Sequence, residues 1–244
     1  MRLNALEGAP AGHRRGMYPF AALYLTLGFV FAVVAFWPSY FSQLATARVG
    51  YHVHGITAVL WLAMLIGQVV LARRKRFDLH RAVGRTSYVL APLFVMGGVW
   101  MVHSLLQMTS PFTQAFGVKL AFYDLAAVAH FAVAYGLAVT VFRRRMKIHA
   151  RLMISTVIPM LFPVIGRLML FYQDFGLSPY HCLVVSLVLT EAVIVALIYQ
   201  ESRRGDTHWP YPALLVVASA QHLGFVYADR WVWWQDFVGW YAGL

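Results

Sequence analysis

Seven runs of about 20 predominantly apolar residues, the length of helix that crosses a bilayer, constrain this chain more than any other feature. Only 12% of the 244 residues are charged and 61% are hydrophobic, whereas a soluble domain carries about 25% charged residues. So few charges cannot cover the surface of a soluble domain. We therefore predict an all-α integral membrane bundle of seven transmembrane helices in contact with the lipid bilayer.

The seven predicted spans are separated by short connections. They cover residues 18–37, 51–72, 86–106, 118–142, 152–172, 179–199 and 211–231. We expect residues 1–17 to form an N-terminal arm, residues 18–234 the transmembrane domain and residues 235–244 a short tail. Pro159 and Pro163 lie inside the fifth span, so they should kink it and free backbone carbonyls that need other hydrogen-bond donors.

Basic residues predict the orientation of the bundle. The N-terminal arm and the loops after the second, fourth and sixth spans carry 16 lysines and arginines, whereas Arg48, Lys119 and Arg230 are the three on the other side. Since cytoplasmic loops are enriched in basic residues, the N-terminus should be cytoplasmic and the C-terminus outside. The net charge of +11 thus reflects membrane topology, and we expect no nucleic-acid partner.

Several functional classes are disfavoured by what the sequence lacks. The one cysteine, Cys182, cannot form an internal disulfide or a Cys-rich zinc or iron–sulfur site. There is no H-E-x-x-H motif of a zinc protease, and the seventh predicted span has no lysine to bind retinal. The first apolar run is long enough to remain a helix, so we expect no cleavable signal peptide.

The second and third predicted spans resemble the fourth and fifth. In the first unit, an apolar span leads to a basic loop, to His80 and then to a span that contains Pro92. In the second unit, the same order ends in His149 and Pro159. Two such units would be related by an axis along the membrane normal, although ordinary membrane topology also produces helix, basic loop and helix.

Ionisable side chains at membrane depth carry the functional argument. Counting about 1.5 Å per helical residue places eight of them between the midplane and the outer ends of six spans. They are His54, His103, Asp124, His130, Arg167, His181, Glu191 and His222. Because each costs a few kcal/mol in lipid, they should face the bundle interior and pair with one another. Pairs that only hold helices together would satisfy the same condition.

Helical spacing adds to this expectation. His54, Trp61 and Gln68 are seven residues apart and should share one face of the second span. By the same spacing, Tyr123 and His130 should share one face of the fourth span. Such aromatic stripes usually reflect packing, but each of these also carries an ionisable group.

Haem b is one cofactor that these histidines could bind. A haem in a helical bundle needs two imidazole ligands from different helices at one depth. His130 with His222 meets that condition at the midplane, and His54 with His103 meets it nearer the outer face.

At the cytoplasmic side, a set of basic residues could hold an anionic group. Arg81, Arg85, His149 and Arg151 lie where spans begin. They could bind haem propionates, a quinone head group or a lipid head group. Helix capping and topology would equally account for their positions.

A non-haem metal ion is a second interpretation. Histidines combined with carboxylates suit zinc, iron or copper. The candidate ligands are His54, His103, Asp124, His181 and Glu191.

Transport is a third interpretation. Glu191, Asp124, Arg167 and the histidines could relay protons or hold a substrate. The prolines of the fifth span and the pair Gly97-Gly98 would then supply flexible points. A role as an accessory or assembly subunit of a larger membrane complex stays open beside these.

The spacing of histidines and arginines also resembles a known group of proteins. His54, the step H-R-A-V-G-R at 80–85, Pro92 and the step H-A-R-L-M at 149–153 are similar to those of bacterial multi-pass inner-membrane proteins of unknown function. This resemblance implies a helical membrane fold in a bacterial inner membrane, without an activity. Histidines on several helices also resemble transmembrane b-type cytochromes, with no ligand matched by position.

From these observations we expect a redox cofactor or metal, preferably haem, among histidines in the outer half of the bundle. Such a protein would be a membrane oxidoreductase, with quinone-linked electron transfer as one reaction. The alternatives are a proton-coupled transporter or a subunit of a larger membrane complex.

Overall fold

The structure is a computed structural model that describes residues 20–172 and 176–244. Within these ranges all regular structure is helical. The α-helices are α1 (Ala21–Phe36), α2 (Val49–Arg73), α3 (Phe77–Leu106), α4 (Pro111–Val139), α5 (Met146–Ser155), α6 (Leu161–Tyr172), α7 (Pro179–Arg203), α8 (Pro210–Tyr227) and α9 (Val232–Ala242). Short 3-10 turns are η1 (Phe41–Gln43), η2 (Ile158–Met160) and η3 (Ala228–Arg230).

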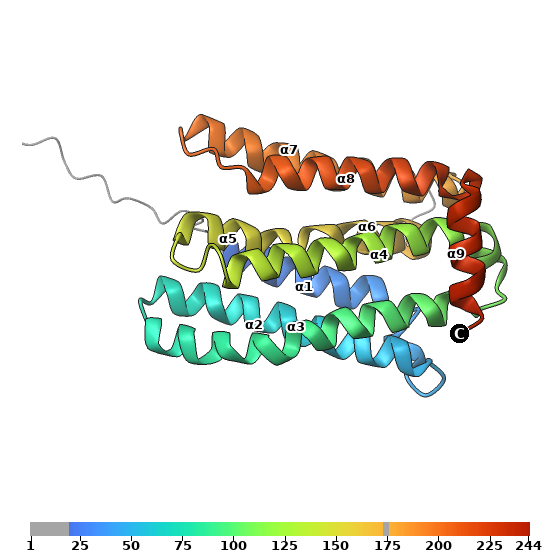
Figure 1. The fold of residues 1–244 in the computed structure, drawn as a ribbon, viewed down its shortest axis with the longest axis horizontal. Helices are drawn as coiled ribbons and strands as arrows, with labels where there is room; N and C mark the ends of the chain where they lie inside the picture. The colour runs from blue at the N-terminus through green and yellow to red at the C-terminus, as the bar shows by residue number, and fades with distance from the viewer. Residues whose placement is uncertain (1–19, 173–175) are drawn as a thin grey trace, which may run out of the picture.

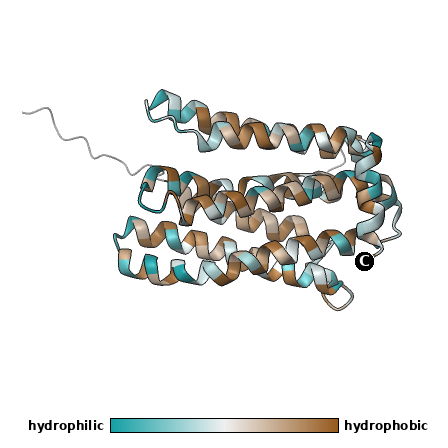
Figure 2. Cartoon of the chain, viewed as in Figure 1, coloured by the Kyte–Doolittle hydropathy of each residue, from teal (hydrophilic) through white to brown (hydrophobic). Residues whose placement is uncertain are grey.

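Six helical segments among the described residues are long and apolar enough to cross a membrane. They are α2, α3, α4, the combined α5–α6 segment, α7 and α8 with η3, and the shorter apolar helix α1 packs against α2 and α6. These helices lie side by side along one direction (Figure 1), and hydrophobic residues predominate along their length (Figure 2). The prediction of a multi-pass helical membrane protein is therefore confirmed.

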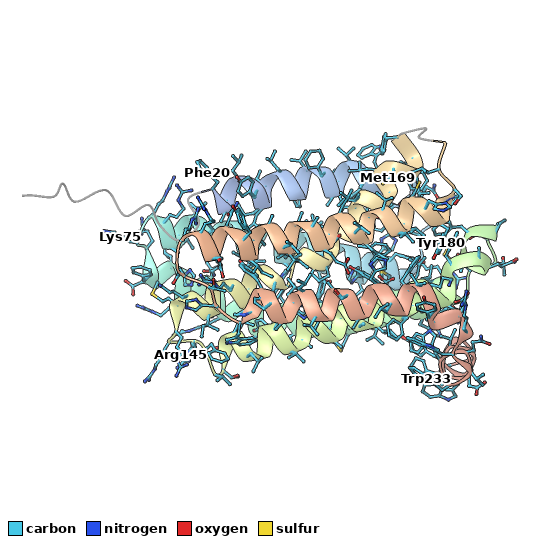
Figure 3. All side chains as sticks on the ribbon, turned by 90° about the horizontal axis from the view of Figure 1, so that it is seen from above. Phe20, Lys75, Arg145, Met169, Tyr180 and Trp233 are labelled. Atoms are coloured by element: carbon cyan, nitrogen blue, oxygen red, sulfur yellow. The ribbon has the colours of Figure 1, made fainter. Side chains whose placement is uncertain are left out.

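The two ends of the bundle differ in character. Lys75 and Arg145 lie at one end, and Met169, Tyr180 and Trp233 lie at the opposite end (Figure 3). We call these the basic end and the aromatic end. The predicted N-terminal arm, residues 1–17, lies outside the described residues.

Several helix boundaries differ from the predicted spans. Helix α3 begins at Phe77, so the H-R-A-V-G-R step lies inside its first turns. Helix α4 begins at Pro111. Ser110 caps this helix by accepting a hydrogen bond from the Thr113 amide, and proline is tolerated in the first turn because an N–H there would have no helical acceptor. Amphipathic and capped extensions of this kind are too polar to be recognised by apolar length alone.

The predicted short tail forms helix α9, which lies across the aromatic end (Figure 1). The Trp234 indole donates to the Val118 carbonyl at 3.0 Å, and the Tyr241 hydroxyl donates to the Val99 carbonyl at 2.6 Å. Aromatic residues with a polar tip favour a membrane interface. Helix α9 is thus attached to α3 and α4 at the aromatic end.

Glycines allow the closest helix contacts. At Gly98 an added Cβ would lie 2.6 Å from the Val128 side chain, and at Gly97 it would lie 3.0 Å from the His54 backbone. We expected this glycine pair to act as a flexible point, but the structure uses it for close packing of α2, α3 and α4. Small residues at helix contacts are the usual solution inside membranes.

The tightest of these contacts predicts a large effect of one methyl group. A Cβ at Gly224 in α8 would lie 1.9 Å from the Phe122 ring of α4, and that ring is held by Trp231 and Trp234. We expect Gly224→Ala to lower the free energy of unfolding by about 1–3 kcal/mol. Gly239→Ala in α9 is the matched control, since its added Cβ would meet nothing within 4 Å. Equilibrium unfolding in mixed micelles would measure both, and equal stability of the two variants would contradict this packing.

Candidate functional site

An acid–base pair joins α7 and α8 inside the bundle. His222 Nδ1 lies 3.3 Å from each carboxylate oxygen of Glu191, and both side chains are about one-fifth exposed. Both residues belong to membrane-spanning segments. The expectation that intramembrane ionisable groups pair with one another is confirmed for these two residues.

Asp124 and Arg167 are opposite charges that do not pair directly. Within the described part of the chain no ion pair of 4.0 Å or less joins them, although their charges act on each other. Arg167 instead donates from Nε to Ser39 Oγ and from Nη1 to the Pro163 carbonyl, both at 3.3 Å. Its guanidinium carbon also lies 4.2 Å from the Phe36 ring centre. The charge of Asp124 also acts on the Tyr51 hydroxyl of α2.

Two α4 side chains bond the carbonyls that the prolines leave without a helical donor. Pro159 has no N–H to offer the Ser155 carbonyl four residues earlier, and His130 Nε2 lies 3.2 Å from that oxygen. Pro163 likewise cannot reach the Pro159 carbonyl, and the Tyr123 hydroxyl donates to it at 2.8 Å. Since a carbonyl only accepts, Nε2 of His130 carries the proton. The predicted shared face of Tyr123 and His130 is therefore confirmed, and it faces the broken helix between α5 and α6.

Tyr123 connects α4 to the broken helix and to α8. Its hydroxyl is affected by the charges of both Asp124 and Glu191. Its backbone carbonyl accepts a hydrogen bond of 3.4 Å from Nε2 of Gln221, whose own Oε1 is buried without a hydrogen-bond partner. We call the following set the polar layer. It comprises Tyr51, Tyr123, Asp124, Arg167, Glu191, Gln221 and His222, from α2, α4, α6, α7 and α8.

An apolar cluster lies between the polar layer and the basic end. Its buried members include Ile158, Ile194, Leu214 and Ala218. Ile194 is three residues from Glu191 toward the basic end, which is about one helical turn. The polar layer is therefore separated from the basic end by packed hydrocarbon.

A second group of charges, the inner ion-pair network, closes the basic end. Arg151 of α5 is buried, with Nε at 2.5 Å from Glu201 of α7 and Nη2 at 3.1 Å from Asp206 in the α7–α8 loop. Lys147 also contacts Asp206, at 2.5 Å. The hydrogen bond from Lys147, reinforced by Arg151, lowers the pKa of the Asp206 carboxyl below its ordinary value. Arg151 thus serves carboxylates of its own chain, which sequence reasoning did not identify as partners.

The other basic-end residues divide into braces and exposed side chains. His149 Nδ1 lies 2.9 Å from the Ala138 carbonyl, and His80 Nδ1 lies 3.3 Å from the Gln68 carbonyl. Each histidine therefore braces its helix against the preceding one, in equivalent places of the two similar units. Arg81 contacts Asp78 and is largely exposed, and Arg85 is also exposed. Among the four predicted anion-binding residues, these two arginines face outward.

The remaining predicted metal ligands lie apart from one another. His54 packs on Phe94 with ring centres 4.9 Å apart, and its Nδ1 is buried without a hydrogen bond. His103 Nε2 lies 3.3 Å from Gln107, and His181 Nδ1 lies 2.7 Å from Ser178 Oγ at the start of α7.

Residues 20–172 and 176–244 contain no group of three or more His, Cys, Asp or Glu side chains that could hold a metal ion. In particular, the two midplane histidines are engaged separately. His130 bonds Ser155, whereas His222 bonds Glu191. Haem and metal binding remain predictions from the sequence.

Comparisons with known proteins add no family to this description. No protein-family model, no curated protein and no solved structure matches the chain. Its function must therefore be argued from the site, because a helical bundle by itself supports many functions.

The proline contacts predict a specific rescue. His130→Ala leaves the Ser155 carbonyl without its donor, and we expect it to lower the free energy of unfolding by about 1–2 kcal/mol. Pro159→Ala returns a backbone N–H that can bond the same carbonyl. In a double-mutant cycle measured by equilibrium unfolding, His130→Ala should therefore cost less in the Pro159→Ala background. An identical cost in both backgrounds would show that His130 does not serve this carbonyl.

Proposed function

We propose that the chain crosses a bacterial inner membrane seven times, with α1 as the first span and the basic end in the cytoplasm. Sixteen of the 20 lysines and arginines support this orientation, since they lie in the N-terminal arm or in the predicted loops after the second, fourth and sixth spans, of which Lys75 and Arg145 mark the basic end (Figure 3). The aromatic end, with α9 lying across it, then faces the outside.

Within this topology the protein is a proton-coupled transporter, and the polar layer is its binding and protonation site. The Glu191–His222 pair carries this proposal, since a carboxylate and an imidazole at 3.3 Å can exchange a proton inside the membrane. Asp124 and Arg167 lie in the same layer and offer opposite charges to a solute.

The broken helix beside the polar layer supports this function. Transporters commonly place their substrate sites near the midplane, where helices are interrupted and backbone groups line the site. Here the interruption between α5 and α6 contains η2 and faces Tyr123 of the polar layer. The inner ion-pair network and the apolar cluster close the cytoplasmic path, so a transport cycle requires them to separate.

Glu191→Gln tests the protonation step. We expect it to reduce solute-driven proton uptake about tenfold or more in proteoliposomes that enclose a pH-sensitive dye, because the amide cannot exchange a proton. The solutes added outside would be separate sets of amino acids, carboxylates, amines and sugars. Asp236→Asn is the matched control, since it makes the same change at an exposed carboxylate of α9. Uptake by Glu191→Gln at the wild-type rate, or no wild-type uptake above empty liposomes for any set, would overturn the proposal.

Haem binding is the second candidate, and one contact favours it. When Nδ1 of His222 donates to Glu191, Nε2 of the same ring is the nitrogen that could bind iron. A carboxylate that orients a histidine in this way is typical of metal ligands. With a second histidine as the other axial ligand, such a protein could transfer electrons to a quinone.

The visible spectrum of the purified protein, before and after dithionite, separates the two candidates. Haem would give a Soret band and sharpened α and β bands on reduction, and His222→Ala should remove or shift them because an axial ligand is lost. Asp236→Asn should leave the bands unchanged. A featureless spectrum from folded protein produced with added haem precursor would reject haem and leave the transport proposal standing.

A further inference from the structure

An open groove runs along α3 at the aromatic end of the bundle, where the end of α9 lies beside it (Figure 1). Its volume is about 400 Å³, which is within the range of small-molecule sites. The lining includes Met96, Val99 and Trp100 of α3, Tyr241 of α9 and the terminal Leu244. Met96 is 59% exposed and Trp100 is 47% exposed, although both belong to a membrane-spanning helix. The groove therefore opens toward lipid and not toward the bundle interior.

Few polar groups line the groove. The Tyr241 hydroxyl donates to the Val99 carbonyl at 2.6 Å, so its proton is already used. The other polar groups of the lining are the His103 imidazole and the Trp100 indole N–H, which are one helical turn apart. The groove therefore suits a mostly hydrocarbon occupant whose polar part lies near these two residues.

A chain of hydrogen bonds leads from the groove to an exposed cation. Arg48, at the start of α2, donates from Nη1 to Oε1 of Gln107 at 2.8 Å and from Nη2 to the Gln107 carbonyl at 3.3 Å. Since an arginine only donates, the amide oxygen of Gln107 faces Arg48, and its amide nitrogen lies 3.3 Å from Nε2 of His103. That nitrogen of His103 therefore accepts, which puts the proton of the neutral ring on Nδ1. Among residues 20–172 and 176–244, nothing accepts a hydrogen bond from Nδ1 of His103.

The charge of Arg48 is not balanced by an acidic side chain. The arginine is exposed, and within the described ranges no Asp or Glu lies within 4.0 Å of its guanidinium. Lys119, another cation near this end, is instead paired with Asp229 at 2.6 Å. A guanidinium has five N–H donors, of which Gln107 uses two. Charge complementarity thus favours an anionic group beside Arg48.

We propose that an anionic phospholipid binds at this place, with its phosphate on Arg48, an ester carbonyl on His103 and an acyl chain in the groove. Gln107, His103, Trp100 and Met96 are separated by four, three and four residues, so they form one stripe along α3. At 1.5 Å per residue, His103 lies about 6 Å deeper than Gln107, and Met96 lies about 10 Å deeper again. Charge, donor and hydrocarbon surface therefore follow one another with depth in the order that a phospholipid's phosphate, ester and chain require.

The two parts of the site select this ligand together. Inorganic phosphate would reach Arg48 and leave the apolar groove unused, whereas a zwitterionic lipid would bring a second cation close to the arginine. The site also includes residues of α2, α3 and α9, so a bound lipid joins the end helix to the bundle. This inference depends on neither the transport nor the haem proposal.

Native mass spectrometry of the wild-type protein in nonionic detergent tests the ligand class. The probes are phosphatidylglycerol and phosphatidylcholine with the same chains, and glycerol phosphate as a competitor that has no chains. We expect one phosphatidylglycerol to bind about tenfold more tightly than phosphatidylcholine, because only the former neutralises Arg48. Glycerol phosphate should not displace it. Equal affinity for the two lipids, or displacement by glycerol phosphate, would overturn the proposal.

Two variants then locate the lipid. Arg48→Gln should lower the affinity for phosphatidylglycerol about tenfold, to that of phosphatidylcholine, whereas Arg230→Gln, at an exposed arginine outside the lining, should not. Val99→Trp should fill the groove and weaken both lipids, whereas Val133→Trp, at an exposed position of α4, should not. If Arg48→Gln fails to fold, Arg48→Lys keeps the charge and should keep the preference for phosphatidylglycerol. Wild-type affinity in folded Arg48→Gln or Val99→Trp protein would exclude this site.

The contact with His103 has its own test. Ether-linked phosphatidylglycerol has the same head group and chains but lacks the ester carbonyls. The wild type should bind it about fivefold less tightly than the ester lipid, since Nδ1 of His103 loses its acceptor. His103→Leu should bind the two lipids alike. A preference for the ester lipid that is as large in His103→Leu as in the wild type would show that His103 makes no such contact.

Discussion

The position of α4 depends on a constraint that a bilayer imposes on every backbone carbonyl. Inside lipid no water replaces a missing hydrogen-bond donor, so a proline in a span obliges some other group to supply one. Pro159 and Pro163 create two such carbonyls, and His130 and Tyr123 of α4 bond them. These contacts set the rotation of α4 about its axis. Asp124 follows Tyr123 in the chain, so the same contacts place its carboxylate in the polar layer.

The two ends of the bundle are stabilised by different interactions. At the basic end, Arg151 is buried against Glu201 and also bonds Asp206, so separating α5 from α7 would leave a buried charge without partners. At the aromatic end, neutral donors of α9 bond carbonyls of α3 and α4. An ion-pair network is strong while closed and can be hydrated once opened. In the proposed transport cycle, the basic end is therefore the end suited to opening and closing.

Contacts made by residues at a regular helical spacing could be predicted from the sequence, whereas contacts between residues far apart in the chain could not. Tyr123 and His130 are seven residues apart, so their shared face followed from helix geometry, and the need of the proline-freed carbonyls for donors followed from proline chemistry. The partners of Arg151 lie 50 and 55 residues away, and neither has a spacing signal.

The depth of the candidate site could be predicted from the sequence, whereas the partners of its residues could not. Depth along the spans indicated that intramembrane ionisable groups would pair, which holds for Glu191 and His222, but it did not indicate which residues would do so. The pairing of Glu191 with His222 depends on the packing of α7 against α8, 31 residues apart in the chain. His181 and His149 were candidate ligands because of their residue type, whereas the structure uses them at a helix start and as a brace. A histidine near a helix end has several structural roles that composition cannot distinguish.

The net charge of the polar layer gives a physical reason for the proposed transporter to bind a proton. Counted by formal charge, Arg167 offsets one of the two carboxylates, Asp124 and Glu191, which leaves the layer with one negative charge when His222 is neutral. The layer is neutral only when the Glu191–His222 pair holds one extra proton, on either the imidazole or the carboxylate. Moving a net charge through hydrocarbon is costly, and a neutral layer avoids that cost. In the proposed transport cycle, a proton bound to the Glu191–His222 pair would therefore keep the layer neutral while its access changes.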